Sequence, residues 1–289
     1  MSEIPVCQPP VRDTRRSTMA TPPGATDCHT HVFERRFLMI PNRGYTPPDS
    51  NLADMLAMHG QIGIERVVFT QPSIYGIDNT AILSAMDQIP HQARAVVAID
   101  MSPTDEDLVA LDRRGVRGVR LNLDNVGGMP IELDEIPTLA GRIAELGWHI
   151  EFLFAGQHFP ELLPVLRSVQ VPISIGHFGY MPAAEGVSYP PFRALVDLIK
   201  EGNTWMKMSG PNRLGVGDLP PWDAVVPLAH ALIEANPERM LWATDWPHPN
   251  KFGDMPNDAD LIEQLALWAP DPALRNRILV DNPAILYGF

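Results

Sequence analysis

Short apolar runs alternate with longer amphipathic segments along most of the chain. The short runs favour buried strands, and the longer segments repeat their apolar residues at the spacing of a helix. Capping or turn residues such as Asp49, Asp78, Thr104 and Asp223 stand near the starts of helical segments. We therefore expect strands at 26–33, 66–71, 93–99, 116–122, 148–154, 171–177, 204–209 and 240–245. Helices are expected at 51–63, 78–90, 104–115, 132–147, 159–170, 190–202, 223–236 and 257–268.

Eight strand–helix units in succession favour a (β/α)8 barrel, although an open parallel sheet could be built from the same pattern. The 289 residues suit one barrel, which commonly occupies about 250 residues. We expect a single barrel domain over residues 24–289. The proline- and arginine-containing stretch 1–23 is expected to form a loosely ordered tail.

The composition narrows the class of protein. A formal net charge of -13 argues against a nucleic-acid partner, because a phosphate backbone selects surfaces rich in Lys and Arg. Cys7 and Cys28 show no paired spacing, as expected in a reducing compartment. There is no apolar run of the roughly 20 residues that a membrane span needs. We expect a cytoplasmic enzyme, monomeric or a small homo-oligomer, whose partner is a small molecule.

Polar residues stand at the ends of three predicted strands, where barrels place their active sites. His29 and His31 lie two apart on the first strand and so face the same side, where they could bind a metal or polarise a carbonyl. His177 ends the sixth strand and Asp245 the eighth. A buried carboxylate is costly without a partner or a role. Incidental polar spacing and capped strand ends are the structural alternatives, but the three sites reinforce one another.

These motifs resemble the amidohydrolase superfamily, and within it the 2-pyrone-4,6-dicarboxylate lactonases and related aldarolactone isomerases. The resemblance rests on His29-x-His31, on His177 and on the run Leu-Trp-Ala-Thr-Asp245-Trp-Pro-His248-Pro-Asn. It extends from about residue 24 to the end and includes the segments 45–47, 115–120, 209–214 and 280–283.

The resemblance implies hydrolysis of a lactone without a required divalent metal. Asp245 would activate water while His29, His31, His177 and an arginine polarise the carbonyl. Binuclear members of the superfamily need a lysine after the fourth strand, but the lysines here are Lys200, Lys207 and Lys251. We therefore expect no cofactor.

One zinc ion is the alternative to a metal-free site. Glu151 on the fifth strand could complete a ligand set with His29, His31 and Asp245. His149 stands at the other end of that strand and is expected to be structural.

The expected substrate is a small monoanionic or neutral lactone. Arg120 and Arg213 match the arginines that the resemblance implies for anion binding, but Val126, Leu153 and Tyr180 stand where the lactonases carry further arginines or a tyrosine. The expected substrate-binding residues are Tyr45, Gln71, Tyr75, Arg120, Asn122, Arg213 and His248, of which His248 could also protonate the departing oxygen. Arg35, Arg36 and Arg43 in the first loop keep a sugar-acid lactone open.

Three other functions compete with lactone hydrolysis. An aldarolactone isomerase needs no water activation, so the presence of Asp245 favours hydrolysis. A zinc-dependent nonoxidative decarboxylase is disfavoured by the missing metal ligand after the fifth strand. A binding protein with decayed catalysis would have lost the polar strand ends, which this chain keeps.

Overall fold

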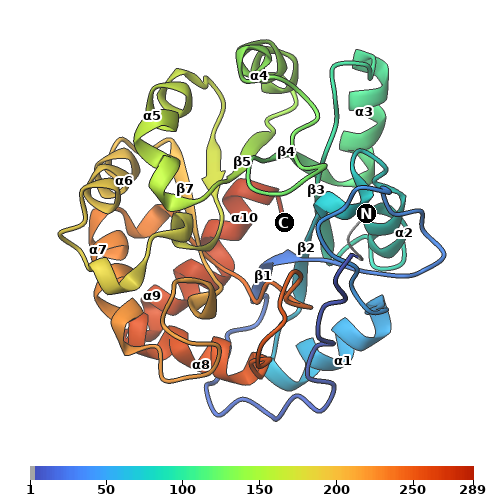
Figure 1. Cartoon of the computed structure of the whole chain (residues 1–289). Coiled ribbons are helices and arrows are strands. Elements are labelled where there is room, and N and C mark those ends of the chain that lie inside the picture. Colours follow the sequence, from blue (N-terminus) through green and yellow to red (C-terminus); the bar gives the residue numbers. More distant parts are fainter. Residues whose placement is uncertain (1–3) are drawn as a thin grey trace.

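The eight predicted strands form one parallel sheet that curves into a nearly closed barrel (Figure 1). The computed structural model describes residues 4–289. The strands pair in sequence order, which confirms the (β/α)8 prediction over the open sheet. They are β1 (Thr26–Thr30), β2 (Arg66–Thr70), β3 (Ala93–Val97), β4 (Val116–Asn122), β5 (His149–Leu153), β6 (Ile173–Ile175), β7 (Thr204–Met208) and β8 (Met240–Trp242).

The seam between the first and last strands is held by backbone hydrogen bonds and one buried carboxylate. The Asp245 amide donates to the His29 carbonyl at 3.0 Å, and the His31 amide donates to the Trp246 carbonyl at 2.8 Å. Asp27 on β1 accepts hydrogen bonds from the amide and hydroxyl of Thr244. These contacts place the ends of β1 and β8 side by side.

Eight helices surround the barrel, α1 to α7 between successive strands and α8 after β8 (Figure 1). Each covers the outside of the sheet with its apolar face; the acidic first turn and Arg-containing last turn of α3 suit the helix dipole. The helices are α1 (Leu52–Ile62), α2 (Thr80–Met86), α3 (Asp105–Arg114), α4 (Ile136–Ala144), α5 (Phe159–Ser168), α6 (Pro190–Lys200), α7 (Val226–Ala235) and α8 (Asp258–Trp268).

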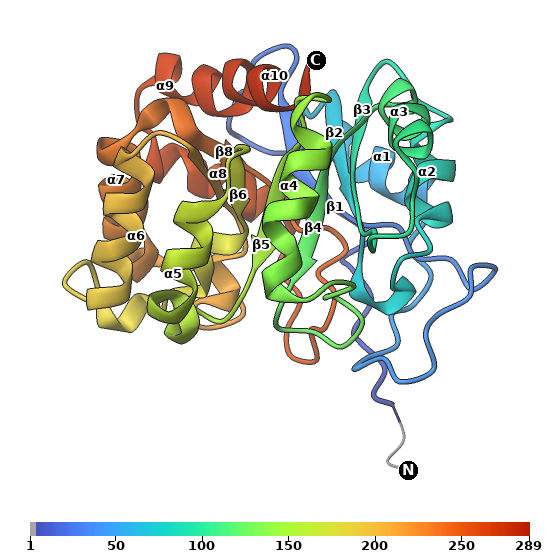
Figure 2. The ribbon, with the colours of Figure 1, turned by 90° about the horizontal axis from the view of Figure 1, so that it is seen from above.

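The chain after α8 forms further helix that the pattern analysis did not predict. Helices α9 (Pro272–Asn276) and α10 (Asn282–Tyr287) flank a π-helical turn, Arg277–Asp281. They lie at the opposite end of the barrel from the first described residues, which are dark blue in Figure 2. The aromatic ring of Tyr287 is buried against His149, so this segment plugs the amino-terminal end of the barrel.

The sixth and eighth strands end earlier than predicted. The predicted strand 171–177 contains β6, which stops at Ile175, and the predicted strand 240–245 contains β8, which stops at Trp242. His177 and Asp245 have backbone φ angles of 51° and 66°, in the left-handed region. A strand cannot continue through such a residue, so both side chains leave the sheet at its rim.

The N-terminal tail, expected to be loosely ordered, is packed against the barrel over its described part. The Cys7 amide donates to the Thr46 carbonyl and the Gln8 amide to the Lys251 carbonyl, each at 2.9 Å. Farther along, Arg15 forms an ion pair with Glu263 on α8. Residues 1–3 lie outside the described residues. The tail therefore links the first loop to the loop after β8.

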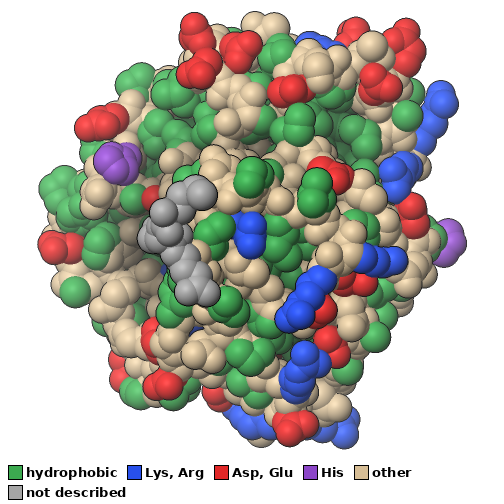
Figure 3. Space-filling view, turned by 45° about the vertical axis from the view of Figure 1, so that its right-hand side comes forward, with side chains coloured by type: hydrophobic (Ala, Val, Ile, Leu, Met, Phe, Trp, Pro, Cys, Tyr) green, Lys and Arg blue, Asp and Glu red, His purple; other side chains and the backbone are tan. Residues whose placement is uncertain are grey.

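The surface carries mixed charge. Acidic, basic and hydrophobic side chains are interspersed over the face drawn in Figure 3. None of the helices in residues 4–289 combines the length and the apolar character that crossing a membrane would require.

Candidate active site

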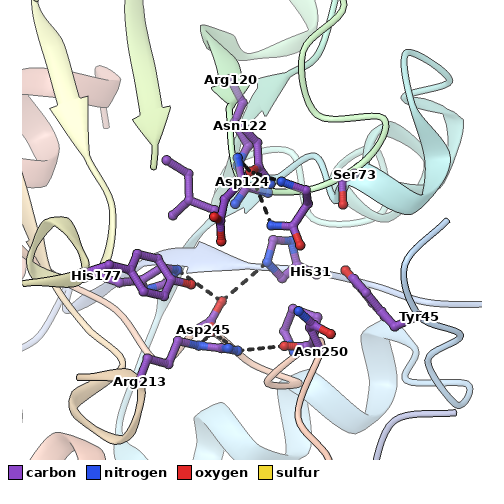
Figure 4. A pocket seen from close by; sticks show the side chains of 14 residues that line it. His31, Tyr45, Ser73, Arg120, Asn122, Asp124, His177, Arg213, Asp245 and Asn250 are labelled. Carbon is purple, nitrogen blue, oxygen red and sulfur yellow. Dashed lines mark hydrogen bonds and ion pairs between the residues drawn. The ribbon is translucent and has the colours of Figure 1, made fainter. Parts of the chain in front are cut away.

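The predicted catalytic residues meet at the carboxyl-terminal rim of the barrel, and Figure 4 shows three of them, His31, His177 and Asp245. The Nε2 atoms of His29, His31 and His177 lie 3.6, 3.4 and 3.6 Å from the same oxygen, Oδ1 of Asp245. All four side chains are almost completely buried. Residues from β1 and from the ends of β6 and β8, far apart in sequence, thus form one cluster.

Strained backbone positions two of these side chains. A left-handed φ in a residue other than glycine costs about 1–3 kcal/mol and persists where the surroundings enforce it. Asp245 is held by the bond from its amide to His29 and by a 2.7 Å bond from the His248 amide to its carbonyl. These hydrogen bonds hold the strained backbone of Asp245 in place, and its carboxylate faces the cavity at the mouth of the barrel.

The partners of the ring nitrogens define what His31 and His177 can do. His31 Nδ1 lies 2.7 Å from the Thr70 carbonyl, which can only accept a hydrogen bond. A neutral His31 ring therefore carries its proton on Nδ1 and presents an acceptor at Nε2. His177 Nδ1 lies 2.8 Å from the Ser209 hydroxyl, which can donate or accept. The sequence analysis did not single out Ser209.

The three imidazoles are neutral at ordinary pH. Burial, followed by the positive charge of Lys207, lowers the pKa of His29 to about 3. Burial also lowers the pKa of His31 and His177, outweighing the opposing effect of Asp245. Each ring therefore offers one N–H donor and one acceptor nitrogen.

Asp245 is a carboxylate held by an arginine. Arg213, on the loop after β7, places Nε 2.7 Å and a terminal nitrogen 2.6 Å from Oδ2 of Asp245. Burial favours a raised pKa, but the positive charge of Arg213 outweighs it and keeps the pKa of Asp245 well below its usual value. One oxygen is thus committed to Arg213, while Oδ1 faces the three rings.

A buried ion pair lies beneath the cluster. Lys207 on β7 binds Glu151 on β5 through Oε2, and both side chains are fully buried. Oε1 of Glu151 lies 3.3 Å from His29 Nδ1 and 3.6 Å from Nε of Arg120. The sequence analysis noted Lys207 only as a lysine in the wrong place for a binuclear metal site.

The site opens into a cavity of about 100 Å³. Four of the expected substrate-binding residues line it: Tyr45, Arg120, Asn122 and Arg213. Three of the four predicted catalytic residues, His31, His177 and Asp245, also line it, whereas His29 does not. The rest of the lining consists of Ser73, Asp124, Asn125, Leu153, Tyr180, Pro249 and Asn250. Burial raises the pKa of Tyr45, so its hydroxyl stays protonated and can donate a hydrogen bond.

The other three expected substrate-binding residues do not line this cavity. The amide nitrogen of Gln71 donates to the carbonyls of Gly76 and Asp78. The Tyr75 hydroxyl contacts the backbone of Glu34, and His248 Nε2 lies 3.1 Å from Asp258. These side chains are occupied in holding the loops.

The arginines of the first loop also have partners of their own outside the cavity. Arg35 pairs with Asp49, and Arg36 pairs with Glu34. Arg43 donates to the Ile40 carbonyl and the Thr46 hydroxyl. Val126 is about half exposed, whereas Leu153 and Tyr180 line the cavity as apolar and aromatic walls.

One group of side chains in residues 4–289 is close enough to hold a metal ion. It consists of His29, His31 and Asp245, whose ligand atoms all lie within 4.8 Å of one another. Glu151, expected as a further zinc ligand, lies instead against Nδ1 of His29, the nitrogen that points away from Asp245. Glu151 therefore lies on the other side of the His29 ring from Asp245 and does not complete the ligand set.

Comparison with known proteins agrees with this geometry. Residues 26–289 match the family described as Amidohydrolase. The chain is 40% identical to a 4-sulfomuconolactone hydrolase of Rhizobium radiobacter, covering 99% of this chain and 97% of the relative. It is 36% identical to a 2-pyrone-4,6-dicarboxylate hydrolase of Comamonas testosteroni, covering 92% and 90%.

More distant relatives keep the same architecture. A D-galactarolactone isomerase of Agrobacterium fabrum is 30% identical over 93% of this chain and 92% of its own. A crystal structure from Agrobacterium tumefaciens superposes with a TM-score of 0.81 at 29% identity, covering 93% of this chain and 97% of that one. With the family match spanning the whole barrel, the chain belongs to the amidohydrolase family.

Proposed function

We propose that the protein hydrolyses a small monoanionic or neutral lactone, with Asp245 as the general base. The observation that carries the proposal is the convergence of three buried imidazoles on one oxygen of Asp245, at 3.4–3.6 Å. Relatives named as lactone hydrolases, 36–40% identical over nearly the whole chain, support the choice of reaction.

The attacking water belongs beside Asp245 and His31. Oδ1 of Asp245 and Nε2 of His31 are both acceptors and lie 3.4 Å apart, so they favour a molecule that donates hydrogen bonds to both. A water held there directs a lone pair toward the substrate carbonyl. This role differs from the carbonyl-polarising role expected for His31, because its N–H is already engaged by Thr70.

In this mechanism Asp245 takes a proton from water and later gives it to the product. Asp245 takes a proton from the water as the hydroxyl adds to the carbonyl carbon, and N–H donors facing the cavity stabilise the oxyanion. The ring C–O bond breaks, and Asp245 returns the proton to the departing oxygen. Because His248 is bonded to Asp258 and does not line the cavity, Asp245 is the better placed donor.

The charge of the cavity supports a substrate with at most one anionic group. Arg213 already binds Asp245, and Arg120 donates to the Gln71 carbonyl at 2.7 Å and faces Glu151. Asp124 adds a negative charge to the lining. One anionic group on the substrate would have to share an arginine that already has a partner, which makes a second such group unfavourable.

Asp245→Asn tests the proposal directly. We expect kcat to fall by roughly 10²–10⁴-fold, the usual range for loss of a general base, while the affinity for an unreactive substrate analogue changes little. Asp197→Asn, on the exposed face of α6, is the matched control and should keep full activity. An Asp245→Asn enzyme with near-normal kcat on the best substrate would refute the assignment.

Labelled water separates hydrolysis from isomerisation, the activity named for one relative. Hydrolysis carried out in H₂¹⁸O places one labelled oxygen in the product carboxylate. An isomerase exchanges the acyl group between hydroxyls of the same molecule and incorporates none. Mass spectrometry of the product therefore decides between the two.

A zinc ion would fit the donor set of His29, His31 and Asp245. Two imidazole nitrogens and one carboxylate oxygen are ordinary zinc ligands, and Nε2 of His29 is a buried atom with no hydrogen-bond partner in residues 4–289. Bound there, zinc would supply an acidified water and a Lewis acid. The proposed water activation by Asp245 and His31 needs neither.

Removal of metal checks this part of the proposal. We expect the protein to retain full turnover of its best lactone after exhaustive chelation, measured as acid release. The panel should include the pyrone dicarboxylate, sugar-acid lactones and uncharged lactones. Activity that disappears on chelation and returns with zinc alone would assign His29 and His31 to the metal instead.

A further inference from the structure

A fully buried lysine lies directly behind the catalytic histidine of β1. Lys207 Nζ is 3.2 Å from His29 Nδ1, bonded to Glu151 Oε2, and 6.0 Å from the centre of the Tyr287 ring. A buried Lys–Glu pair is a weak source of stability, because desolvation of both charges offsets their attraction. Its position against His29 points to another role.

Two charged groups compete for Nδ1 of His29, and they demand opposite protonation. An ammonium group can only donate, so a bond from Lys207 requires Nδ1 to be unprotonated. A carboxylate can only accept, so a bond to Glu151 requires Nδ1 to carry the hydrogen. Oε1 of Glu151 lies 3.3 Å away but forms no hydrogen bond with any residue in 4–289, whereas the Lys207 contact has hydrogen-bond geometry.

We propose that Lys207 is a positioning residue that fixes His29 as the tautomer protonated on Nε2, which turns His29 into a hydrogen-bond donor facing the reaction site. With Nδ1 accepting from Lys207, the one ring hydrogen of a neutral His29 is carried by Nε2. Nε2 has no other partner in the described residues and faces Oδ1 of Asp245 at 3.6 Å.

The two histidines of the His-x-His motif then have complementary tautomers. His31 donates from Nδ1 to the Thr70 carbonyl and presents an acceptor to the cavity side, whereas His29 accepts at Nδ1 and presents a donor. If the proposed lactone hydrolysis is correct, His31 orients the water and the N–H of His29 faces Oδ1 of Asp245, the oxygen that takes up the proton. The tautomer of His29 itself does not depend on that function.

Lys207 also acts against a cation at the same histidine. A metal at Nε2 of His29 requires that nitrogen to be unprotonated, and it would add positive charge across the ring from Nζ of Lys207. Removing the ammonium group is therefore expected to raise the affinity of the site for Zn²⁺ by at least about tenfold.

Nitrogen-15 NMR of the metal-free protein tests the inference without any substrate. Ring nitrogen shifts and two-bond couplings distinguish the two neutral tautomers, and His29→Gln identifies the His29 signals among the nine histidines. We expect the Nε2–H tautomer in the wild type. Observation of the Nδ1–H tautomer, or of a mixture, would overturn the proposal whatever the enzyme hydrolyses.

Variants at Lys207 and Glu151 should differ in their effect on the tautomer of His29. Lys207→Met leaves Glu151 as the partner of Nδ1, so the ring should change to Nδ1–H and bind Zn²⁺ more tightly in calorimetry. Glu151→Gln keeps Lys207 and should keep Nε2–H. Lys200→Met, the same replacement at an exposed lysine, is the control and should change neither the tautomer of His29 nor the affinity for Zn²⁺. An unchanged tautomer in Lys207→Met would refute the assignment.

Lys207→Met could fail to fold because it leaves Glu151 buried and unpaired. The double variant Lys207→Met/Glu151→Gln removes both charges and serves in its place. The amide group introduced at position 151 can donate or accept, so the expected result is loss of the uniform Nε2–H signal. In either variant, kcat on the best lactone should fall with little change in KM, because the N–H of His29 faces Asp245 and does not line the cavity that would bind the substrate.

Discussion

Asp245, the proposed general base, combines two properties that oppose each other in that role. Its carboxylate is ionised at ordinary pH because Arg213 outweighs the effect of burial on its pKa. The same stabilisation makes it a weaker base, since efficiency rises as the pKa approaches the working pH. An anionic group on the substrate would share Arg213 and thereby restore basicity to Asp245 when the substrate binds.

Replacing Arg213 should move the acid limb of the pH–rate profile. Arg213 lowers the pKa of Asp245, so Arg213→Met should raise that pKa, and the loss of kcat/KM on acidification should begin at a higher pH than in the wild type. Arg213→Lys keeps a positive charge and should shift the limb less. Profiles measured from about pH 3 to pH 8 that coincide for Met and wild type would contradict the assigned pairing.

At the scale of single elements, β4 needs a glycine where it passes β5. Gly118 pairs with His149, and a Cβ on residue 118 would lie 2.6 Å from the His149 ring and 2.8 Å from its carbonyl oxygen. The His149 ring is fixed by a 2.8 Å hydrogen bond to the Arg117 carbonyl and by contact with Tyr287. The small residue therefore lets His149 pack inside the base of the barrel.

Gly118→Ala is expected to destabilise the protein by about 1–3 kcal/mol, the usual cost of overpacking. Gly141→Ala is the matched control. Gly141 is exposed on α4 with no atom within 4 Å of its would-be Cβ, so this change should stabilise by about 0.5–1 kcal/mol through helix propensity. Urea unfolding of both variants gives the comparison, and equal effects of the same sign would contradict the packing argument.

At the scale of the whole molecule, buried neutral histidines make stability depend on pH. The pKa of His29 is lowered to about 3 and that of His149 to about 4, chiefly by burial, from an ordinary value of 6.5. Between about pH 6.5 and those values the unfolded chain binds protons that the folded chain does not, so the free energy of unfolding falls as pH falls. Asp245 and Glu151, with lowered pKa values, add a further loss at lower pH.

We therefore expect the melting temperature to fall between about pH 6.5 and pH 4, before most carboxylates are protonated. His149→Asn should make this fall shallower, because it removes one group that takes up a proton on unfolding. His158→Gln, at an exposed ring, is the control and should leave the dependence unchanged. A melting temperature that is flat down to about pH 4.5 would show that the buried histidines do not govern stability.

Local sequence was enough to predict the barrel and to group the residues that are proposed to react. The alternation of strand and helix periods can be seen in local sequence, and eight strand–helix units in succession commonly close into a (β/α)8 barrel. Strand-end residues of a barrel must converge at its rim, so His29, His31, His177 and Asp245 could be grouped before their distances were known. The family resemblance, confirmed by the match over residues 26–289, supplied the reaction class.

The neighbours of those groups emerge only once the whole barrel is packed. Lys207 and Glu151 lie 56 positions apart, and no periodic pattern predicts that they pair beneath His29. Three expected substrate-binding residues follow predicted strands, but their side chains turn out to have other partners. Those of Gln71 and Tyr75 bind loop backbone, and that of His248 binds Asp258. The tautomer of a histidine, the pKa of a buried group and the availability of an arginine for substrate all depend on contacts across the barrel. These contacts form only when distant segments pack together, so the local sequence does not reveal them.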